Sequence, residues 1–240
     1  MRIAAPAREA RELVVLALGC TVMATLAALA VERWPLALYA GADFTASVWY
    51  VLGFKLGYML GVPLAWLRWH GYHLPEVLGP WRSTLRSWVG IAIAVAAGLA
   101  LNLQHVGPIG ELIAAGAAWP RIALGVVLPL VAAAIPEELV FRVLLQTRLE
   151  KVSGRLVAIG VSTLLFALWH LPSRFLLATG VEGTAGDLGS ILLGTGLPVF
   201  VVGLILAAIW DRWRSVAVIV ALHFAIDLLP SLRHALGGTF

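Results

Sequence analysis

Long apolar segments alternate along this sequence with short loops that carry most of its arginines. Most of these segments reach the roughly 20 residues that are needed to cross a hydrocarbon core of about 30 Å. Inside a bilayer each segment must satisfy its own backbone hydrogen bonds, so segments of this kind fold as helices. We therefore predict an all-α fold, a polytopic membrane helix bundle with about seven transmembrane helices. The segments are approximately Leu13–Val31, Val48–Leu67, Trp88–Leu103, Arg121–Gln146, Leu156–Ala178, Ile191–Trp210 and Ser215–Leu232.

The composition supports one integral membrane domain over residues 1–240. The chain is 61% hydrophobic and 12% charged, and a soluble domain usually carries about twice that charged fraction. The net charge of +4 reflects loop arginines, so we expect no nucleic-acid partner. A single cysteine, Cys20, excludes a disulfide framework and a cysteine-based zinc cluster. The segment Leu13–Val31 is too long for the apolar region of a signal peptide, and we expect it to be the first span.

Loop charges predict the orientation. The N-terminal stretch and the second, fourth and sixth loops carry two or three basic residues each, whereas the other loops and the tail carry one each. Basic loops stay on the cytoplasmic side. We therefore expect a multi-pass protein of the cell (inner) membrane with a cytoplasmic N-terminus and an external C-terminus. The stretch Trp69–Trp88 mixes Trp, His, Arg and Pro. We interpret it as interfacial, with a substrate gate as the alternative.

Ionisable residues inside three apolar segments call for an explanation. Each costs about 2.5–3.5 kcal/mol on insertion scales, so six of them would cost on the order of 15 kcal/mol unless they pair or contact water. The six residues are Glu137, Glu138, Arg142, His170, His223 and Asp227.

A further ionisable residue, Lys55, lies in the second segment. We interpret it as snorkelling to the interface, with a path-lining role as the alternative.

Helical spacing separates the roles of the acidic residues. Glu138 and Arg142 are four residues apart, so they share a face and can form a structural ion pair. Glu137 lies about 100° around the helix and has no partner within it. A buried carboxylate of this kind is a candidate general base. Pro136 removes one helix hydrogen bond just before the pair and permits a kink.

The histidines complete a candidate catalytic set. His223 and Asp227 are four residues apart, so Asp227 can orient the imidazole. His170 follows Phe166 by about one turn. Hydrolysis of an acyl bond needs a base, a proton carrier and donors for the oxyanion. We predict that Glu137, His170, His223 and Asp227 meet at similar depth, with Glu138, Arg142 and Phe166 in support.

Three motifs in this order resemble those of the CPBP membrane proteases. They are Glu-Glu-x-x-x-Arg, Phe-x-x-x-His and His-x-x-x-Asp within a motif core at about 121–230, where Gly203 and Ser215 also fit. The group takes in the Rce1-like CAAX prenyl proteases, the bacterial Abi proteins and a myxosortase-like branch. The resemblance implies an intramembrane endopeptidase in which Glu137 and His170 activate water.

The resemblance further implies that His223 and the last motif residue steady the oxyanion. Many members of the family carry Asn at that last position, where this chain has Asp227. An ionised aspartate cannot donate a hydrogen bond. Asp227 is therefore either protonated, or orients His223, or binds a metal.

Several alternatives remain open. A divalent metal such as zinc could bind Glu137, His170, His223 and Asp227, although no standard zinc motif is present. Ser162 offers a weak serine-protease pattern, and a bond to its own backbone is the simpler interpretation. A transporter or proton path and a non-catalytic scaffold or immunity protein belong to other classes. The partners we expect are membrane lipid and a membrane-anchored peptide or protein substrate.

Overall fold

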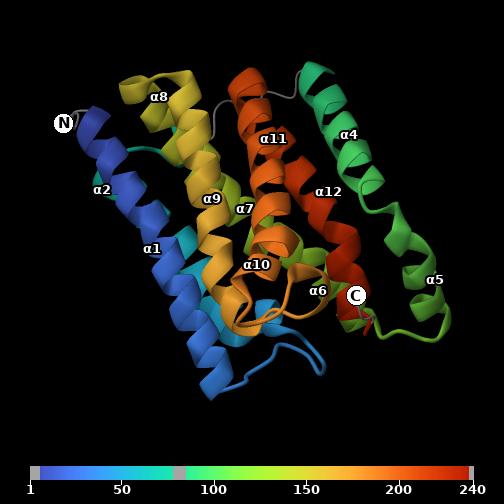
Figure 1. The fold of residues 1–240 in the computed structure, drawn as a ribbon. Coiled ribbons are helices and arrows are strands. Elements are labelled where there is room, and N and C mark those ends of the chain that lie inside the picture. Colours follow the sequence, from blue (N-terminus) through green and yellow to red (C-terminus); the bar gives the residue numbers. More distant parts are fainter. Residues whose placement is uncertain (1–5, 78–84, 238–240) are drawn as a thin grey trace.

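The computed structural model describes residues 6–77 and 85–237, and these form a helical bundle (Figure 1). Within them, the one β pairing outside the helices is an isolated bridge between Ala37 and Ser47. The predicted polytopic helix bundle is confirmed. Six helices in the described part are long and apolar enough to cross a membrane: Pro6–Arg33, Trp49–Trp69, Trp119–Ser153, Arg155–Leu177, Leu188–Trp213 and Val216–Ala235.

The third predicted span differs from a straight helix. Residues Trp88–Ala100 and Leu103–Ala114 form a pair of helices bent by 61°, which makes a seventh span if the pair crosses as one. The pair consists of α4 (Leu85–Ala100) and α5 (Val106–Ala114), joined by the single turn η3 (Leu103–His105). Of the interfacial stretch predicted at Trp69–Trp88, residues 78–84 lie outside the described residues.

The first half of the chain runs down, up and down again in the view of Figure 1. After α1 (Pro6–Arg33), a loop that contains the short turn η1 (Phe44–Ala46) leads into the second span. That span consists of the π-helical η2 (Trp49–Gly61) and α2 (Val62–Trp69), and the short α3 (Leu74–Val77) follows it.

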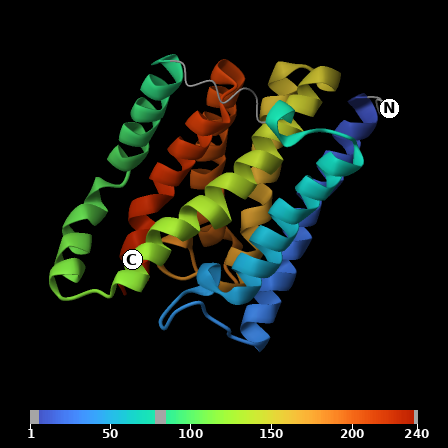
Figure 2. The ribbon, with the colours of Figure 1, turned by 180° about the vertical axis from the view of Figure 1, so that it is seen from behind.

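One long helix then rises diagonally across the back of the bundle as seen in Figure 1, the side that faces the viewer in Figure 2. Its 35 residues extend about 50 Å, so the helix must tilt to fit a bilayer. The π-helical turns, in which the ring of backbone hydrogen bonds is wider, lie on both sides of Pro136 and Glu137. Its parts are α6 (Trp119–Leu128), η4 (Pro129–Ala134), α7 (Ile135–Glu138), η5 (Leu139–Gln146) and α8 (Thr147–Ser153).

The last three spans return through the centre of the bundle. Gly154 makes the sharp turn from α8 into α9 with a φ of +82°, a conformation that favours glycine. The N-terminus and the C-terminus lie at opposite ends of the bundle (Figure 1). The elements are α9 (Arg155–Leu177), η6 (Gly180–Glu182), α10 (Leu188–Ile191), η7 (Leu192–Gly196), α11 (Leu197–Trp213) and α12 (Val216–Ala235).

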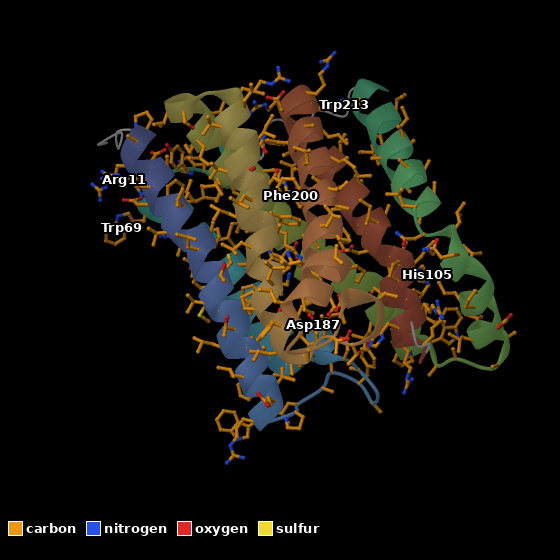
Figure 3. All side chains as sticks on the ribbon, viewed as in Figure 1. Arg11, Trp69, His105, Asp187, Phe200 and Trp213 are labelled. Carbon is orange, nitrogen blue, oxygen red and sulfur yellow. The ribbon has the colours of Figure 1, made fainter. Side chains whose placement is uncertain are left out.

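Packing places α9 at the centre. It contacts α1 on one side and α11 on the other, while α12 packs against α4 and α6. Large apolar side chains remain exposed on the outer faces, as expected where lipid replaces water. On α1 these are Val15, Leu18, Val22, Leu26 and Leu29, and Phe200 lies on α11 about midway along the bundle (Figure 3). The polar side chains of the three motifs therefore need partners inside the bundle.

Candidate active site

Lys55 reaches into the centre of the bundle and forms an ion pair with Glu137. Its Nζ contacts Oε1 of Glu137 from η2, a different helix. Lys55 is 5% exposed, and its ammonium group lies 4.0 Å from the centre of the Trp169 ring. The interpretation of Lys55 as a snorkelling residue is therefore wrong, because a carboxylate and an aromatic face hold its charge inside the bundle.

The second oxygen of Glu137 is one of several buried polar atoms in this region that lack a hydrogen-bond partner. Oε2 is buried and makes no hydrogen bond within the described part of the chain. Its near neighbour is Nε2 of His223, at 3.8 Å. As predicted, Glu137 has no partner within its own helix. One oxygen is thus fixed by a cation, while the other is free to accept a hydrogen bond.

Glu138 and Arg142 form the ion pair that their spacing predicts. Arg142 Nε lies 3.5 Å from Glu138 Oε2, and both side chains are completely buried. The guanidinium group also donates to the carbonyl oxygen of Gly203 at 3.0 Å and lies 4.1 Å from the centre of the Phe166 ring. Gly203 allows this close approach, since a Cβ there would lie 2.9 Å from Phe166 Cδ1. Arg142 therefore ties the long helix to α9 and α11.

His223 lies between carboxylates on both sides of its ring. Nδ1 is 2.7 Å from Glu138 Oε1, and Nε2 is 3.3 Å from Asp227 Oδ2. The predicted contact between His223 and Asp227 is confirmed, whereas the contact with Glu138 was not predicted. The carboxyl groups of Glu137, Glu138 and Asp227 lie within 4 Å of Lys55, Arg142 or His223. Mutual pairing thus offsets the cost of burying these groups.

His170 lies near this cluster without joining its ion pairs. Its Nδ1 donates to the carbonyl oxygen of Phe166 at 2.8 Å, which leaves the lone pair of a neutral ring on Nε2. The Phe166 ring contacts both imidazoles, with ring centres 5.1 Å from His170 and 6.1 Å from His223. Glu137 and His170 line one cavity, but their charged atoms form no ion pair within 4 Å.

A cavity of about 380 Å³ connects these residues with one end of the bundle. Glu137, His170, His223 and Asp227 all line it, and a volume of this size is typical of small-molecule and peptide sites. Toward the end of the bundle the lining includes loop residues. Burial, together with the nearby carboxylate of Asp43, raises the pKa of Tyr39 to about 12, so this phenol remains a hydrogen-bond donor at neutral pH. Tyr39, Asp43, Arg174, Glu182 and His234 form this outer part.

The outer part is itself held by ion pairs and hydrogen bonds. Arg174 donates to Tyr50 Oη at 2.9 Å and to Glu182 Oε1 at 3.2 Å. His234 Nε2 accepts a hydrogen bond from the backbone N–H of Asp43 at 3.1 Å. The contacts of Arg174 join the end of α9 to η2 and η6, and the contact of His234 joins the end of α12 to the loop after α1.

Two alternatives from the sequence receive no support from this geometry. Among the described residues, no group of three or more His, Cys, Asp or Glu side chains is arranged to hold a metal ion. The four candidate ligands therefore do not fit a zinc site, because three of them pair with one another or with Lys55. Ser162 Oγ donates to the carbonyl oxygen of Ile159 at 3.3 Å and is completely buried, as the simpler interpretation predicts.

One comparison with known proteins finds a similar family. No curated protein and no solved structure matches the chain. Residues 119–229 match the family model described as Type II CAAX prenyl endopeptidase Rce1-like. The matched segment holds Glu137, Glu138, Arg142, His170, His223 and Asp227, while Lys55 lies outside it. This segment, somewhat less than half of the chain, is similar to the Rce1-like family of CAAX prenyl endopeptidases.

Proposed function

We propose that this protein hydrolyses a peptide bond in a membrane-associated protein or peptide, with Glu137 as the general base for the attacking water. The observation that carries the proposal is the free Oε2 of Glu137, buried beside a cavity and next to His223. A buried carboxylate oxygen without a partner is costly, and a bound water that donates to it removes that cost. The same water would be positioned to attack a carbonyl group in the cavity.

In the proposed reaction, residues of the cluster account for each proton transfer. As the water oxygen bonds to the carbonyl carbon, its proton passes to Oε2 of Glu137. The C–N bond of the peptide then breaks, and the leaving nitrogen takes that proton, which restores the carboxylate. His170, which lines the same cavity, assists by accepting a hydrogen bond on Nε2 from the water or the leaving amine.

His223 is proposed to stabilise the oxyanion. In its protonated form Nε2–H can donate to the negative oxygen that develops during attack, which is the charge that a protease must stabilise. Glu138 and Asp227 hold the ring through Nδ1 and Nε2. Of the three roles open for Asp227, its contact with Nε2 favours the orientation of His223.

The test is a comparison of membrane proteomes from cells that carry the native protein, Glu137→Gln or Glu111→Gln. Glu111 is an exposed glutamate on α5, so its variant makes the same chemical change away from the cavity. We expect a set of new protein termini with the native protein and with Glu111→Gln, and loss of the whole set with Glu137→Gln. Folding is checked by thermal unfolding in detergent.

Two other results would contradict the proposed function. If well-folded Glu137→Gln leaves the termini unchanged, Glu137 is not the base. If neither the native protein nor Glu111→Gln produces any new termini while a cellular phenotype persists, the transporter or scaffold alternatives gain support.

A further inference from the structure

The cavity extends from the buried cluster toward one end of the bundle only. On the long helix the residues that line it are Leu128, Pro129, Ala132, Ala133 and Glu137. Beyond Glu138, every residue of η5 from Leu139 to Gln146 is buried. The cavity therefore lies on the N-terminal side of Glu137 along this helix. In Figures 1 and 2 the long helix begins at the end of the bundle where the C-terminus lies.

The cavity-lining residues of α12 and α9 lie toward the same end of the bundle, although these two helices run antiparallel to the long helix. Along α12, which descends to the C-terminus, the lining begins at His223 and continues through Asp227 to His234. Along α9, which also descends, it runs from Phe166 to Arg174. The outermost lining comes from the loop after α1 and the loop after α9, both at the lower end in Figure 1.

The opposite end of the bundle is closed by packed side chains. Gln146 donates to the carbonyl oxygen of Ala207 at 3.0 Å, and Trp210 Nε1 donates to Thr147 Oγ1 at 3.1 Å. Nearer the N-terminus, Arg148 pairs with Glu9 at 2.7 Å. These contacts join α1, η5, α8 and α11 above the buried cluster, so among the described residues packed side chains fill this part of the bundle.

Basic residues distinguish the two ends. Arg11 and Trp213 lie toward the closed end, and Asp187 lies toward the open one (Figure 3). Among the described residues, the segments at the closed end carry more than half of the chain's 17 Lys and Arg residues: Arg8, Arg11, Arg68, Arg86, Arg148, Lys151, Arg155, Arg212 and Arg214. The loops and the tail at the open end carry Arg33, Arg121, Arg174 and Arg233. Basic segments of this kind remain in the cytoplasm.

We propose that the cavity opens on the extracytoplasmic side and that the substrates are membrane-anchored polypeptides whose cleaved bond lies at that face. This proposal rests on the proposed function. It separates the chain from a protease that processes lipidated C-termini in the cytoplasm, because such an end would meet the closed face. The polar outer lining, with Tyr39, Asp43 and Arg174, suits a hydrated polypeptide that enters from outside the bilayer core.

Cysteine labelling tests the direction of opening without any need for activity. The chain has one cysteine, Cys20, which is fully buried, so Cys20→Ala provides a background. In the Cys20→Ala background, Ser231→Cys or Ala133→Cys would place a single cysteine in the cavity lining. Thr184→Cys, exposed in the loop after α9, and Ser153→Cys, exposed at the closed end, report on the two faces. The probe is a membrane-impermeant maleimide, applied to spheroplasts before and after permeabilisation.

The expected result is that the two cavity cysteines and Thr184→Cys react in intact spheroplasts, while Ser153→Cys reacts only after permeabilisation. The proposal is overturned if the cavity cysteines react only after permeabilisation. It is also overturned if Thr184→Cys reacts in intact spheroplasts while both cavity cysteines stay unlabelled. Two cavity positions guard against the failure of one variant to fold.

The position of cleavage gives a second, independent readout. Termini that depend on Glu137 should map to the extracytoplasmic boundary of membrane proteins. Termini at the cytoplasmic boundary would overturn the direction while leaving the proposed hydrolysis intact. If no termini depend on Glu137, the proposed function fails, and the labelling result still decides on which side the cavity opens.

Discussion

Lys55 and Glu137 form an ion pair between a helix outside the family-matched segment and the first motif within it. The pair fixes one carboxylate oxygen and leaves the other without a hydrogen bond, in a residue that lines the cavity. Since the ammonium group also lies over Trp169, its position is set from two sides. A general base with one oxygen held in place needs little reorganisation before it accepts a proton.

The first prediction concerns the removal of this cation. Lys55→Met keeps the volume and apolar character of the side chain but leaves Glu137 as an uncompensated buried charge. Breaking a buried ion pair in this way typically costs about 3–5 kcal/mol. We expect a clear drop in the midpoint of thermal unfolding in detergent and at least a tenfold loss of cleavage. Lys151→Met, at an exposed position, is the matched control.

A double variant separates stability from catalysis. Lys55→Met with Glu137→Gln removes both charges, so most of the lost stability should return while cleavage stays absent. Equal unfolding midpoints for Lys55→Met and Lys151→Met would show that the pair contributes nothing to the fold. Full cleavage by Lys55→Met would remove Lys55 from the mechanism.

Much of this arrangement could be predicted from the sequence, because burial in lipid restricts what polar residues can do. The helical bundle followed from the apolar segments, and the pair of Glu138 with Arg142 followed from their spacing of four. The contact of His223 with Asp227 followed in the same way. Each of these predictions concerns residues on one helix, where geometry relates sequence distance to spatial distance.

Contacts between helices could not be predicted in this way. The pairing of Lys55 with Glu137 and that of Glu138 with His223 depend on how each helix is rotated and tilted, which local spacing does not determine. Lys55 did carry a usable signal, since the insertion cost applied to Glu137 holds equally for an ammonium group in the middle of a span. The outer cavity lining comes partly from loops, which have no periodic pattern.

The second prediction concerns Gly203. A Cβ at this position would lie 2.9 Å from Phe166 Cδ1 and 3.5 Å from Arg142 Nη2, in a completely buried environment. Overpacking of this kind costs about 1–3 kcal/mol, so Gly203→Ala should unfold at a lower temperature and cleave more slowly. Gly160→Ala is the matched control, because a Cβ at Gly160 meets nothing within 4 Å. If the two variants are equally stable, the close approach of Arg142 to α11 is not required.

The third prediction concerns metal removal. Because no three metal-binding side chains among the described residues are arranged around one point, we expect cleavage by the purified protein to be unchanged by EDTA. A known zinc protease in the same detergent and buffer provides the positive control for chelation. Loss of cleavage that zinc restores would instead favour the metal-dependent alternative with Glu137, His170, His223 and Asp227 as ligands.

The fourth prediction concerns Asp227, the last residue of the third motif. The contact with His223 Nε2 needs an acceptor, and the amide oxygen of Asn can supply one. We therefore expect Asp227→Asn to retain cleavage within about tenfold of the native protein, whereas Asp227→Ala should lose roughly 10²-fold, at the lower end of general acid–base contributions. Initial rates on a peptide that contains a mapped cleavage site would measure both. If Asn proves as damaging as Ala, the negative charge of Asp227 is essential, since it then balances a protonated His223 rather than only orienting the ring.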